Sequence, residues 1–309
     1  MIFKFDNEEM SPKVRLDIFV SENAKTTRSG AQKLIEDGCV LVNGKTESKN
    51  YKLRIGDTIK ISLPEPKVLD VLAQDIPIDI VYEDEDLIIV NKPQGMVVHP
   101  AAGNPDGTLV NAIMHHSGDN LSAINGIIRP GIVHRIDKET SGLLVIAKNN
   151  ESHLILADLI KRHLFDREYV CLAYGKFPED KFTVDKPIGR HEKDRKKMTV
   201  TDKNSRHAVT HFEVLERFSS CSLLLCTLET GRTHQIRVHL QSIGKSIVGD
   251  PIYGLKKDVL AQKYHLSGQM LHARRLGFCH PRNGQYVNFI KEPPKYFKDV
   301  IEDLRKKQL

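Results

Sequence analysis

The order of apolar segments after residue 78 constrains the fold more than any other feature of the chain. Stretches with the alternation or β-branched content of strands follow one another as far as residue 229, and helical patterns interrupt them only occasionally. A doubly wound parallel sheet would need regular alternation of strands and helices. The sequence therefore predicts an α+β fold, with a mixed, mostly antiparallel central sheet and flanking helices.

The individual elements of this region can be placed by residue. Two amphipathic helices are expected, one over residues 149–163 with Asn150 as its cap and one over residues 233–244 that ends at Gly244. Strands are expected within residues 78–92, 143–148, 167–175, 182–189, 207–218 and 221–229.

The N-terminal part of the chain has a different pattern, in which two short helices precede short strands. Apolar residues from Leu16 indicate the first helix, a second is expected over residues 31–37, and Asn43-Gly44 predicts a tight turn after a strand. Residues 64–77 contain prolines and sustain no periodicity, which is typical of a linker. We expect a small module over residues 13–63, a linker over 64–77 and a larger domain over 78–309.

Charge and cysteine content narrow the class of protein. The chain carries 46 Lys and Arg against 40 Asp and Glu, and this net charge of +6 favours a polyanionic partner without proving one. No apolar run reaches the ~18 residues that a membrane helix needs, and the first residues do not resemble a signal peptide, so a cytoplasmic protein is expected. Five cysteines without a CxxC pair argue against zinc and a disulfide framework.

Common catalytic motifs are missing from the sequence. There is no P-loop, no GxGxxG after a strand, no HExxH and no GxSxG. A glycosidase would need two converging carboxylates, and Asp137 and Glu139 are too close in one turn to converge. Structural hydrogen bonds are a better interpretation than metal ligation for His134, His234 and His239, so no metal is expected.

Asp137 is the best candidate for a reactive residue. It lies between Arg135 and Lys138, in a loop that enters an apolar strand, where a carboxylate needs a cation or several donors to stay ionised. A surface turn with a local ion pair is the alternative, and it would contribute only ~0–1 kcal/mol. Arg237, on the predicted helix after residue 232, could reach Asp137 and hold it as a nucleophile.

Long motifs in this region resemble the RluA/RluD-type pseudouridine synthases. "HRIDKETSGLLVIAKN" is similar to the family's aspartate signature, "REYVCLAYG" to its tyrosine segment and "TGRTHQIRVHLQSIGKSIVGDPIYG" to its arginine segment. Residues 76–113 resemble the RluD-like branch, and the N-terminal module resembles an S-four-like RNA-binding module. The likeness covers about residues 13–295.

The resemblance implies roles for particular residues. Asp137 would be the nucleophile on a target uridine, Tyr169 would stack on the base and assist proton removal from C5, and Arg237 would pair with the aspartate. Arg135 would help to extrude the base. Further RNA contacts are expected from the N-terminal module, the arginine segment and a basic hairpin over residues 189–200, namely from Arg15, Arg28, His191, Arg195, Lys196, Lys197 and Arg232.

The same resemblance implies an isomerisation that needs no cofactor, in a monomer whose partner is RNA. Ribosomal RNA of the large subunit is the expected substrate, and transfer RNA is an alternative. A non-catalytic RNA-binding factor for ribosome assembly, and an unrelated hydrolase that uses Asp137, also remain open. The hydrolase would require a second base or a metal that the sequence does not reveal.

Overall fold

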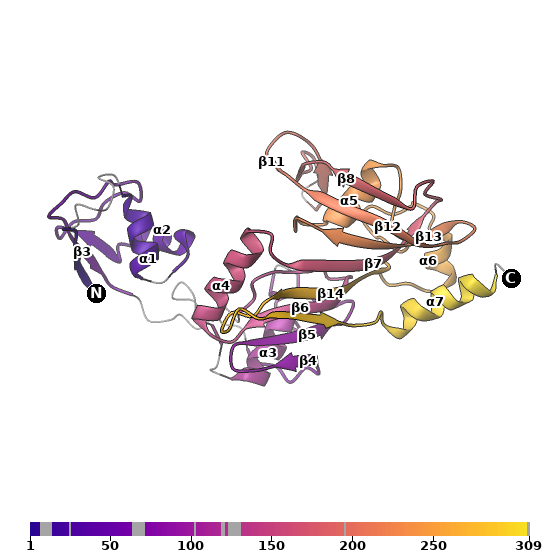
Figure 1. Cartoon of the computed structure of the whole chain (residues 1–309), viewed down its shortest axis with the longest axis horizontal. Coiled ribbons are helices and arrows are strands. Elements are labelled where there is room, and N and C mark those ends of the chain that lie inside the picture. The colour runs from indigo at the N-terminus through magenta and orange to yellow at the C-terminus, as the bar shows by residue number, and fades with distance from the viewer. Residues whose placement is uncertain are drawn as a thin grey trace.

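The computed structural model describes residues 1–6, 14–24, 26–63, 72–101, 103–118, 121–122, 131–194 and 196–307. Figure 1 shows a small body at the N-terminal end, coloured indigo, and a larger body built around one long sheet. Each body has buried apolar side chains of its own, with the cluster around Leu16, Val20 and Ile59 in the small one.

The N-terminal body packs two helices against a three-stranded antiparallel sheet. The second helix begins at Arg28, earlier than expected, because the Thr27 side chain accepts a hydrogen bond from the Gly30 N–H and caps it. The sequence prediction missed strand β1, which pairs with β3 to give the order β1-β3-β2. The elements are β1 (Ile2–Lys4), α1 (Leu16–Asn23), α2 (Arg28–Glu36), β2 (Val40–Val42) and β3 (Thr58–Ile61).

The larger body contains a nine-stranded sheet. The strands lie in the order β4-β5-β6-β14-β7-β13-β12-β8, and β15 pairs with β14 beside this path. The strands are β4 (Asp79–Glu83), β5 (Leu87–Lys92), β6 (Ser141–Ala147), β7 (Asp166–Tyr174), β8 (Lys181–Asp185), β12 (Val209–Arg217), β13 (Cys221–Leu228), β14 (Leu271–Cys279) and β15 (Tyr286–Ile290).

Strand β14 makes the sheet mixed. It is parallel to β6, where His272 and Ala273 are the partners of Ser141 and Gly142, and it is antiparallel to β7 and β15. Every other strand pair in the described part of this sheet is antiparallel. The predicted fold class is therefore confirmed, and the crossing of β14 between β6 and β7 brings the two halves of the sheet together.

Helices flank the sheet, and three of them were not predicted. The predicted cap of α4 was wrong by one residue, because the Asn149 side chain, and not that of Asn150, accepts from the Ser152 N–H over 2.8 Å. One face of α7 completes the main core with Phe297, Val300 and Leu304. The helices are α3 (Leu109–Ser117), α4 (Asn150–Lys161), α5 (Gln235–Ser242), α6 (Val259–Lys263) and α7 (Lys295–Lys306). None of the helices in the described residues is long and apolar enough to span a membrane.

A second small sheet follows β8. The predicted strand over residues 182–189 is two strands in the structure, because the chain turns at Pro187. The three strands lie in the order β10-β9-β11, and they are β9 (Ile188–Arg190), β10 (Met198–Val200) and β11 (Ser205–Arg206). The antiparallel pair β9 and β10 forms the hairpin that the sequence predicted.

Candidate active site

The loop that carries Asp137 is fixed where it enters β6. The Thr140 N–H donates to the carbonyl of Asp137 over 3.1 Å and closes a turn, and Gln269 donates to the Thr140 hydroxyl over 3.0 Å. The next residue, Ser141, hydrogen bonds to His272 on β14 over 2.9 Å. Thr140 and Ser141 therefore attach this loop to Gln269, which precedes β14, and to β14 itself.

Gly142 completes this attachment, and no other residue fits its position. Its φ angle is +117°, and a Cβ atom built there would lie 2.3 Å from the carbonyl oxygen of Ala273. The parallel contact between β6 and β14 thus needs a glycine, because any side chain would push the two backbones apart.

A buried lysine holds the other side of the Asp137 loop. Lys92 is almost fully buried, and its ammonium group donates to the carbonyls of Pro93, Met96 and Lys138 at 2.7, 2.8 and 3.1 Å. Burial lowers the pKa of Lys92 to about 7, although the charges of Glu139 and Asp137 oppose that shift. Lys92 thereby ties the β5 end to the backbone one residue after Asp137.

Asp137 is paired with Arg237, which lies on α5. Arg237 Nη1 donates to Asp137 Oδ2 over 2.8 Å, and the two residues are 100 positions apart in the sequence. The Asp137 side chain keeps 20% of its surface exposed, whereas that of Arg237 keeps 3%. The cation is therefore part of the protein interior, and the carboxylate faces the solvent side.

Arg237 is held by a second acid that the sequence analysis missed. Its Nε and Nη2 donate to Asp250 Oδ2 and Oδ1 at 2.7 and 2.8 Å, and the Asp250 side chain is fully buried. Burial alone would lower the pKa of the Arg237 guanidinium, but its hydrogen bonds to Asp250 and the charges of both acids raise it above its usual range. The sequence signal that could have revealed Asp250 is "GDPIYG", in which the acid stands between a glycine and a proline. This stretch ends the arginine segment that the sequence analysis compared with the family.

His234 lies on the other side of Asp137. Its Nε2 is 3.8 Å from Asp137 Oδ1, and its Nδ1 is 2.8 Å from the Tyr253 hydroxyl, which also accepts from the Met198 N–H over 2.8 Å. In the tautomer in which that hydroxyl donates to Nδ1, the ring hydrogen is on Nε2 and faces Asp137. Burial lowers the pKa of His234, so the ring is neutral near pH 7. The contact with Tyr253 links the strand β10 of the basic hairpin to the site.

The backbone of His234 is itself unusual. Its φ and ψ angles of 57° and 21° are left-handed, and a non-glycine residue in that region is strained. Sequence analysis treated His134, His234 and His239 alike as structural. His134 accepts from the Val145 N–H over 3.1 Å, and His239 bonds to Thr210 over 2.9 Å, whereas His234 belongs to the site.

A cavity of about 60 Å³ opens in front of Asp137. Tyr169 of β7 and Arg237 both line it, so the three predicted catalytic residues lie at one cavity although they come from separate parts of the chain. Arg135 and Arg232, two of the predicted RNA contacts, also line this cavity, and Arg135 is exposed. Burial raises the pKa of Tyr169, and the charge of Asp137 raises it further, so the hydroxyl stays neutral near pH 7.

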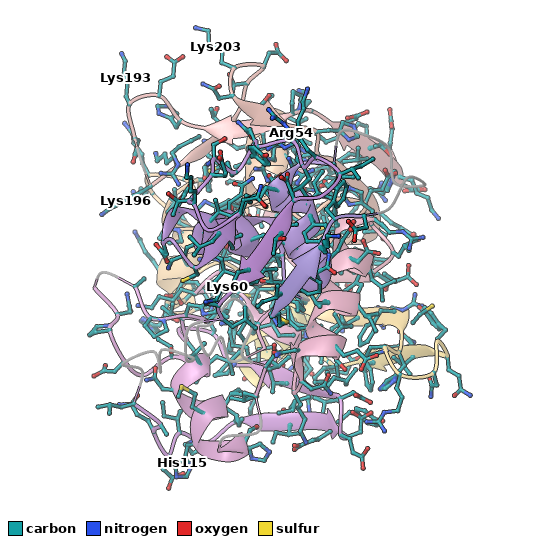
Figure 2. The ribbon with its side chains drawn as sticks, turned by 90° about the vertical axis from the view of Figure 1, so that its left-hand side faces the viewer. Arg54, Lys60, His115, Lys193, Lys196 and Lys203 are labelled. Carbon is teal, nitrogen blue, oxygen red and sulfur yellow. The ribbon has the colours of Figure 1, made fainter. Side chains whose placement is uncertain are left out.

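The other predicted RNA contacts lie at two further places. The first is the β9–β10 hairpin, where His191 Nδ1 accepts from the N–H groups of Lys193 and Asp194, and where Lys196 is exposed and Lys197 half-buried. Arg195 lies outside the described residues. Figure 2 shows Lys193, Lys196 and Lys203 projecting outward from this part of the chain.

The second place is the N-terminal body, where Arg15 and Arg28 share a buried acid. Arg15 Nη2 and Arg28 Nε donate to Asp17 Oδ2 at 2.9 and 3.0 Å, and Gln32 donates to the same oxygen over 2.8 Å. Both arginine side chains stay partly exposed, whereas that of Asp17 is fully buried. Sequence analysis missed Asp17, which explains why the arginines lie side by side.

One group of potential metal ligands occurs among the described residues, outside the cavity. Asp84, Asp86 and His280 lie close together beside the start of β5, but each carboxylate already accepts hydrogen bonds from protein donors. His280 donates to Asp84 over 2.9 Å, and Arg282 pairs with Asp86. The group is explained as an ion-pair network. The five cysteines are free, and Cys171, Cys221 and Cys226 are buried as predicted.

Comparison with known proteins assigns the family. Residues 86–242 match the family model of RNA pseudouridylate synthases, and residues 14–59 match that of the S4 domain. The chain is 50% identical over 293 residues to an uncharacterized RNA pseudouridine synthase of Bacillus subtilis, covering 94% of each protein. It is 45% identical over 277 residues to the ribosomal large subunit pseudouridine synthase D of Zymomonas mobilis, covering 88% of this chain and 87% of that protein.

The fold agrees with this assignment. The solved structure of human RNA pseudouridylate synthase domain containing 1 superposes with a TM-score of 0.59 at 23% identity, covering 75% of this chain and 96% of the human one. Together with the matches over most of the sequence, the common fold identifies the chain as a member of the RNA pseudouridine synthase family, an RNA-directed isomerase with an N-terminal S4 domain.

Proposed function

We propose that this enzyme converts uridines of large-subunit ribosomal RNA to pseudouridine and that Asp137 is its nucleophile. The observation that carries the proposal is the pairing of Asp137 with Arg237 at a cavity that Tyr169 also lines. A carboxylate that a buried guanidinium orients toward a cavity suits a nucleophile, and the substrate of an isomerisation supplies both the leaving group and the group that replaces it.

Asp137 Oδ1 is the oxygen that meets the substrate. Oδ2 is occupied by Arg237 at 2.8 Å, whereas the one contact of Oδ1 within the described part of the chain is the longer one of 3.8 Å with His234. In the reaction the N1–C1′ bond of the uridine breaks, uracil turns and C5 bonds to C1′, after which C5 loses a proton and N1 gains one. Asp137 assists departure of uracil at the sugar, and attack on the ring of the base is the alternative.

Tyr169 and Arg135 position the target uridine in this proposal. Tyr169 forms a wall of the cavity, from which it stacks on uracil and assists removal of the C5 proton. Arg135 and Arg232 line the same cavity, so two cations lie beside the place of the base. Arg135 is exposed and can swing out, and it then fills the gap in the RNA left by the everted uridine.

The names of two relatives support the ribosomal substrate. Proteins of Zymomonas mobilis and Xanthomonas campestris that are 45% and 39% identical to this chain are named ribosomal large subunit pseudouridine synthase D. The S4 domain with Arg15 and Arg28 and the hairpin with Lys196 and Lys197 add cationic surfaces for a large folded RNA. The enzyme acts as a cytoplasmic monomer in this proposal.

The test is a map of pseudouridine in total RNA from cells with and without the gene. The proposal predicts that sites in large-subunit ribosomal RNA disappear in the deletion strain and return with the wild-type gene. Loss of sites only in transfer RNA would replace the proposed substrate, and an unchanged map would reject it.

A further inference from the structure

A second cavity adjoins the one in front of Asp137. Its volume is about 510 Å³, and the two cavities share Arg135, Tyr169, Leu228 and Arg232 as lining residues. The described residues that line it include no acidic side chain and two histidines, His134 and His163, and its five lysines and arginines are Arg135, Lys161, Arg167, Arg206 and Arg232. They come from α4, β7, β11 and the loops before β6 and α5, so folding gathers them from distant parts of the chain.

Arg167 is the least expected of these cations, because it is buried without a counter-ion among the residues that the structure describes. It is 6% exposed, its Nε has no hydrogen-bond partner in the described structure, and its Nη2 has only a long contact of 3.4 Å with the Glu229 carbonyl. Burial lowers the pKa of the Arg167 guanidinium, and the charge of Arg232 lowers it further. A buried, unpaired cation is costly to the folded state.

The other arginine that is buried among the described residues has acidic partners. Arg237 has Asp250 and Asp137, and Arg275 donates to Glu168 over 2.7 Å on the neighbouring strand. Glu168 follows Arg167 in the sequence, but strand alternation places its side chain on the opposite face of β7. Among the described residues, Arg167 is therefore the one buried arginine that has no acidic partner.

The chain also leaves space for the Arg167 guanidinium. A Cβ atom at Gly231 would lie 2.4 Å from Arg167 Nη1, and Gly231 lines the same cavity. The backbone of Gly231 has no positive φ angle, so the close approach of the guanidinium is the feature that a side chain at this position would disturb.

We propose that this cavity binds a phosphate group of the RNA backbone beside the everted uridine, with Arg167 as its central ligand. Tyr169 stands two residues further along β7 and lines both cavities, so the phosphate and the base of one bound strand can occupy them together. Guanidinium groups bind phosphate through two parallel hydrogen bonds, and the unpaired Nε of Arg167 is a donor for one of them. The inference rests on the proposed function for the nucleotide that occupies the neighbouring cavity.

The first experiment needs no RNA substrate. The variants Arg167→Met and Arg305→Met each remove one positive charge, but Arg305 lies on α7 and pairs with Glu216, so it serves as the control. Thermal unfolding of the full chain is measured in sodium chloride and in inorganic phosphate at equal ionic strength. We expect phosphate to raise the Tm of the wild type and of Arg305→Met, but not that of Arg167→Met.

The same measurement separates a binding role from a structural one. Methionine removes a buried unpaired charge and keeps most of the side-chain volume, so Arg167→Met should unfold in chloride at the wild-type temperature or above it. A lower Tm in chloride, combined with an unchanged shift in phosphate, would mean that Arg167 only supports the fold and would overturn the inference.

The second experiment uses the RNA fragment around a mapped target uridine. Loss of one phosphate contact should weaken binding of Arg167→Met roughly 10-fold or more and reduce the slope of log affinity against log salt by about 0.7–0.9. Replacing the phosphate that occupies the cavity by a neutral methylphosphonate should weaken RNA binding by the wild type by the same factor. The same replacement should not weaken RNA binding by Arg167→Met any further. If the methylphosphonate at every tested position weakened RNA binding equally in the wild type and in Arg167→Met, this result would contradict the phosphate site.

Gly231→Ala provides a variant that keeps the charge. Its methyl group displaces the guanidinium, so it should reproduce the weaker RNA binding and the absent phosphate shift of Arg167→Met. If Gly231→Ala kept both the RNA affinity and the phosphate-induced Tm shift of the wild type, this result would count against the site. These binding results do not depend on which RNA is modified in cells, so failure of the phosphate site and failure of the ribosomal substrate can be told apart.

Discussion

Arg237 holds the buried Asp250 through two nitrogens, Nε and Nη2, at 2.7 and 2.8 Å. Only Nη1 is left for the catalytic candidate Asp137, at 2.8 Å. The two acids share one cation, and Asp250 also accepts from the N–H groups of Ile252 and Tyr253 at 2.9 Å each. Asp250 therefore fixes the orientation of Arg237, and Arg237 in turn orients Asp137.

Arg237→Ala should destabilise the protein as well as inactivate it. Removal of the arginine leaves the fully buried Asp250 without a counter-ion, which costs about 3–5 kcal/mol in the free energy of unfolding. Urea denaturation measures this loss. The double variant with Asp250→Ala should lose much less than the sum of the single losses, because it leaves no unpaired charge. Additive losses would contradict the shared ion pair.

Asp17→Asn should make the stability of the N-terminal body less dependent on pH. Burial alone would raise the pKa of Asp17, but hydrogen bonds from Arg15, Gln32 and Arg28 lower it from 3.8 to about 2. Because the folded pKa is below the unfolded one, this carboxylate stabilises the fold above pH 4, and its contribution disappears as the pH falls through 2.

The expected difference in stability between wild type and Asp17→Asn is about 2–3 kcal/mol at pH 7 and close to zero near pH 2. Urea denaturation, followed by a probe in the N-terminal body, measures it at several pH values. Asp6→Asn is the control, because Asp6 is exposed and its one ion pair among the described residues is with the exposed Lys4. A difference that stays constant with pH would contradict the role of Asp17.

Tyr253→Phe should slow the reaction more than it unfolds the protein. The substitution removes the hydroxyl that joins the Met198 N–H to His234 Nδ1, at a cost of about 0.5–1.5 kcal/mol in stability. His234 then loses its fixed orientation beside Asp137, so kcat should fall by about 10-fold or more, whereas KM changes little. Tyr82→Phe, which removes an exposed hydroxyl bonded to Asp84, should leave kcat unchanged. Equal kcat values for both variants would show that the hydroxyl of Tyr253 has no part in the site.

Gly142→Ala should disrupt the site through the backbone. The new methyl group would overlap the Ala273 carbonyl, so the contact between β6 and β14 opens at a cost above about 3 kcal/mol. Gly44→Ala is the matched control, since Gly44 also has a positive φ angle but has nothing within 4 Å of its Cβ position. The control should lose about 1 kcal/mol, from backbone strain alone. Similar unfolding midpoints for the two variants would argue against the close approach.

The sequence predicted the fold class and the residues at the cavity because both depend on long local patterns. Alternating strands identify the sheet, and the motifs around Asp137, Tyr169 and Arg237 are each several residues long. The strand β1 was missed because three residues give almost no periodicity, and its partner β3 is more than 50 positions away. The helix α7 was missed although Phe297, Val300, Ile301 and Leu304 have helical spacing, so the signal was there.

A different cause explains why the sequence analysis missed three further residues, at the candidate site and outside it. Asp250, Asp17 and Arg167 each gain their importance from burial and from partners that the chain brings close only on folding. Asp250 looks like an ordinary turn residue beside Pro251, and Arg167 looks like a polar residue of a strand. Apart from the turn "GDPIYG" around Asp250, no local pattern distinguishes these buried charges from exposed ones, so their roles are recognised only once the partners are in place.

The most direct test of the central claim measures pseudouridine formation by Asp137→Asn under single-turnover conditions, on the RNA fragment that contains a mapped target uridine. Asparagine keeps the shape of the side chain and one acceptor for Arg237, so the variant should fold and bind RNA as the wild type does. The account predicts that no pseudouridine forms. Pseudouridine formed at a rate close to that of the wild type would contradict the role of Asp137 as nucleophile.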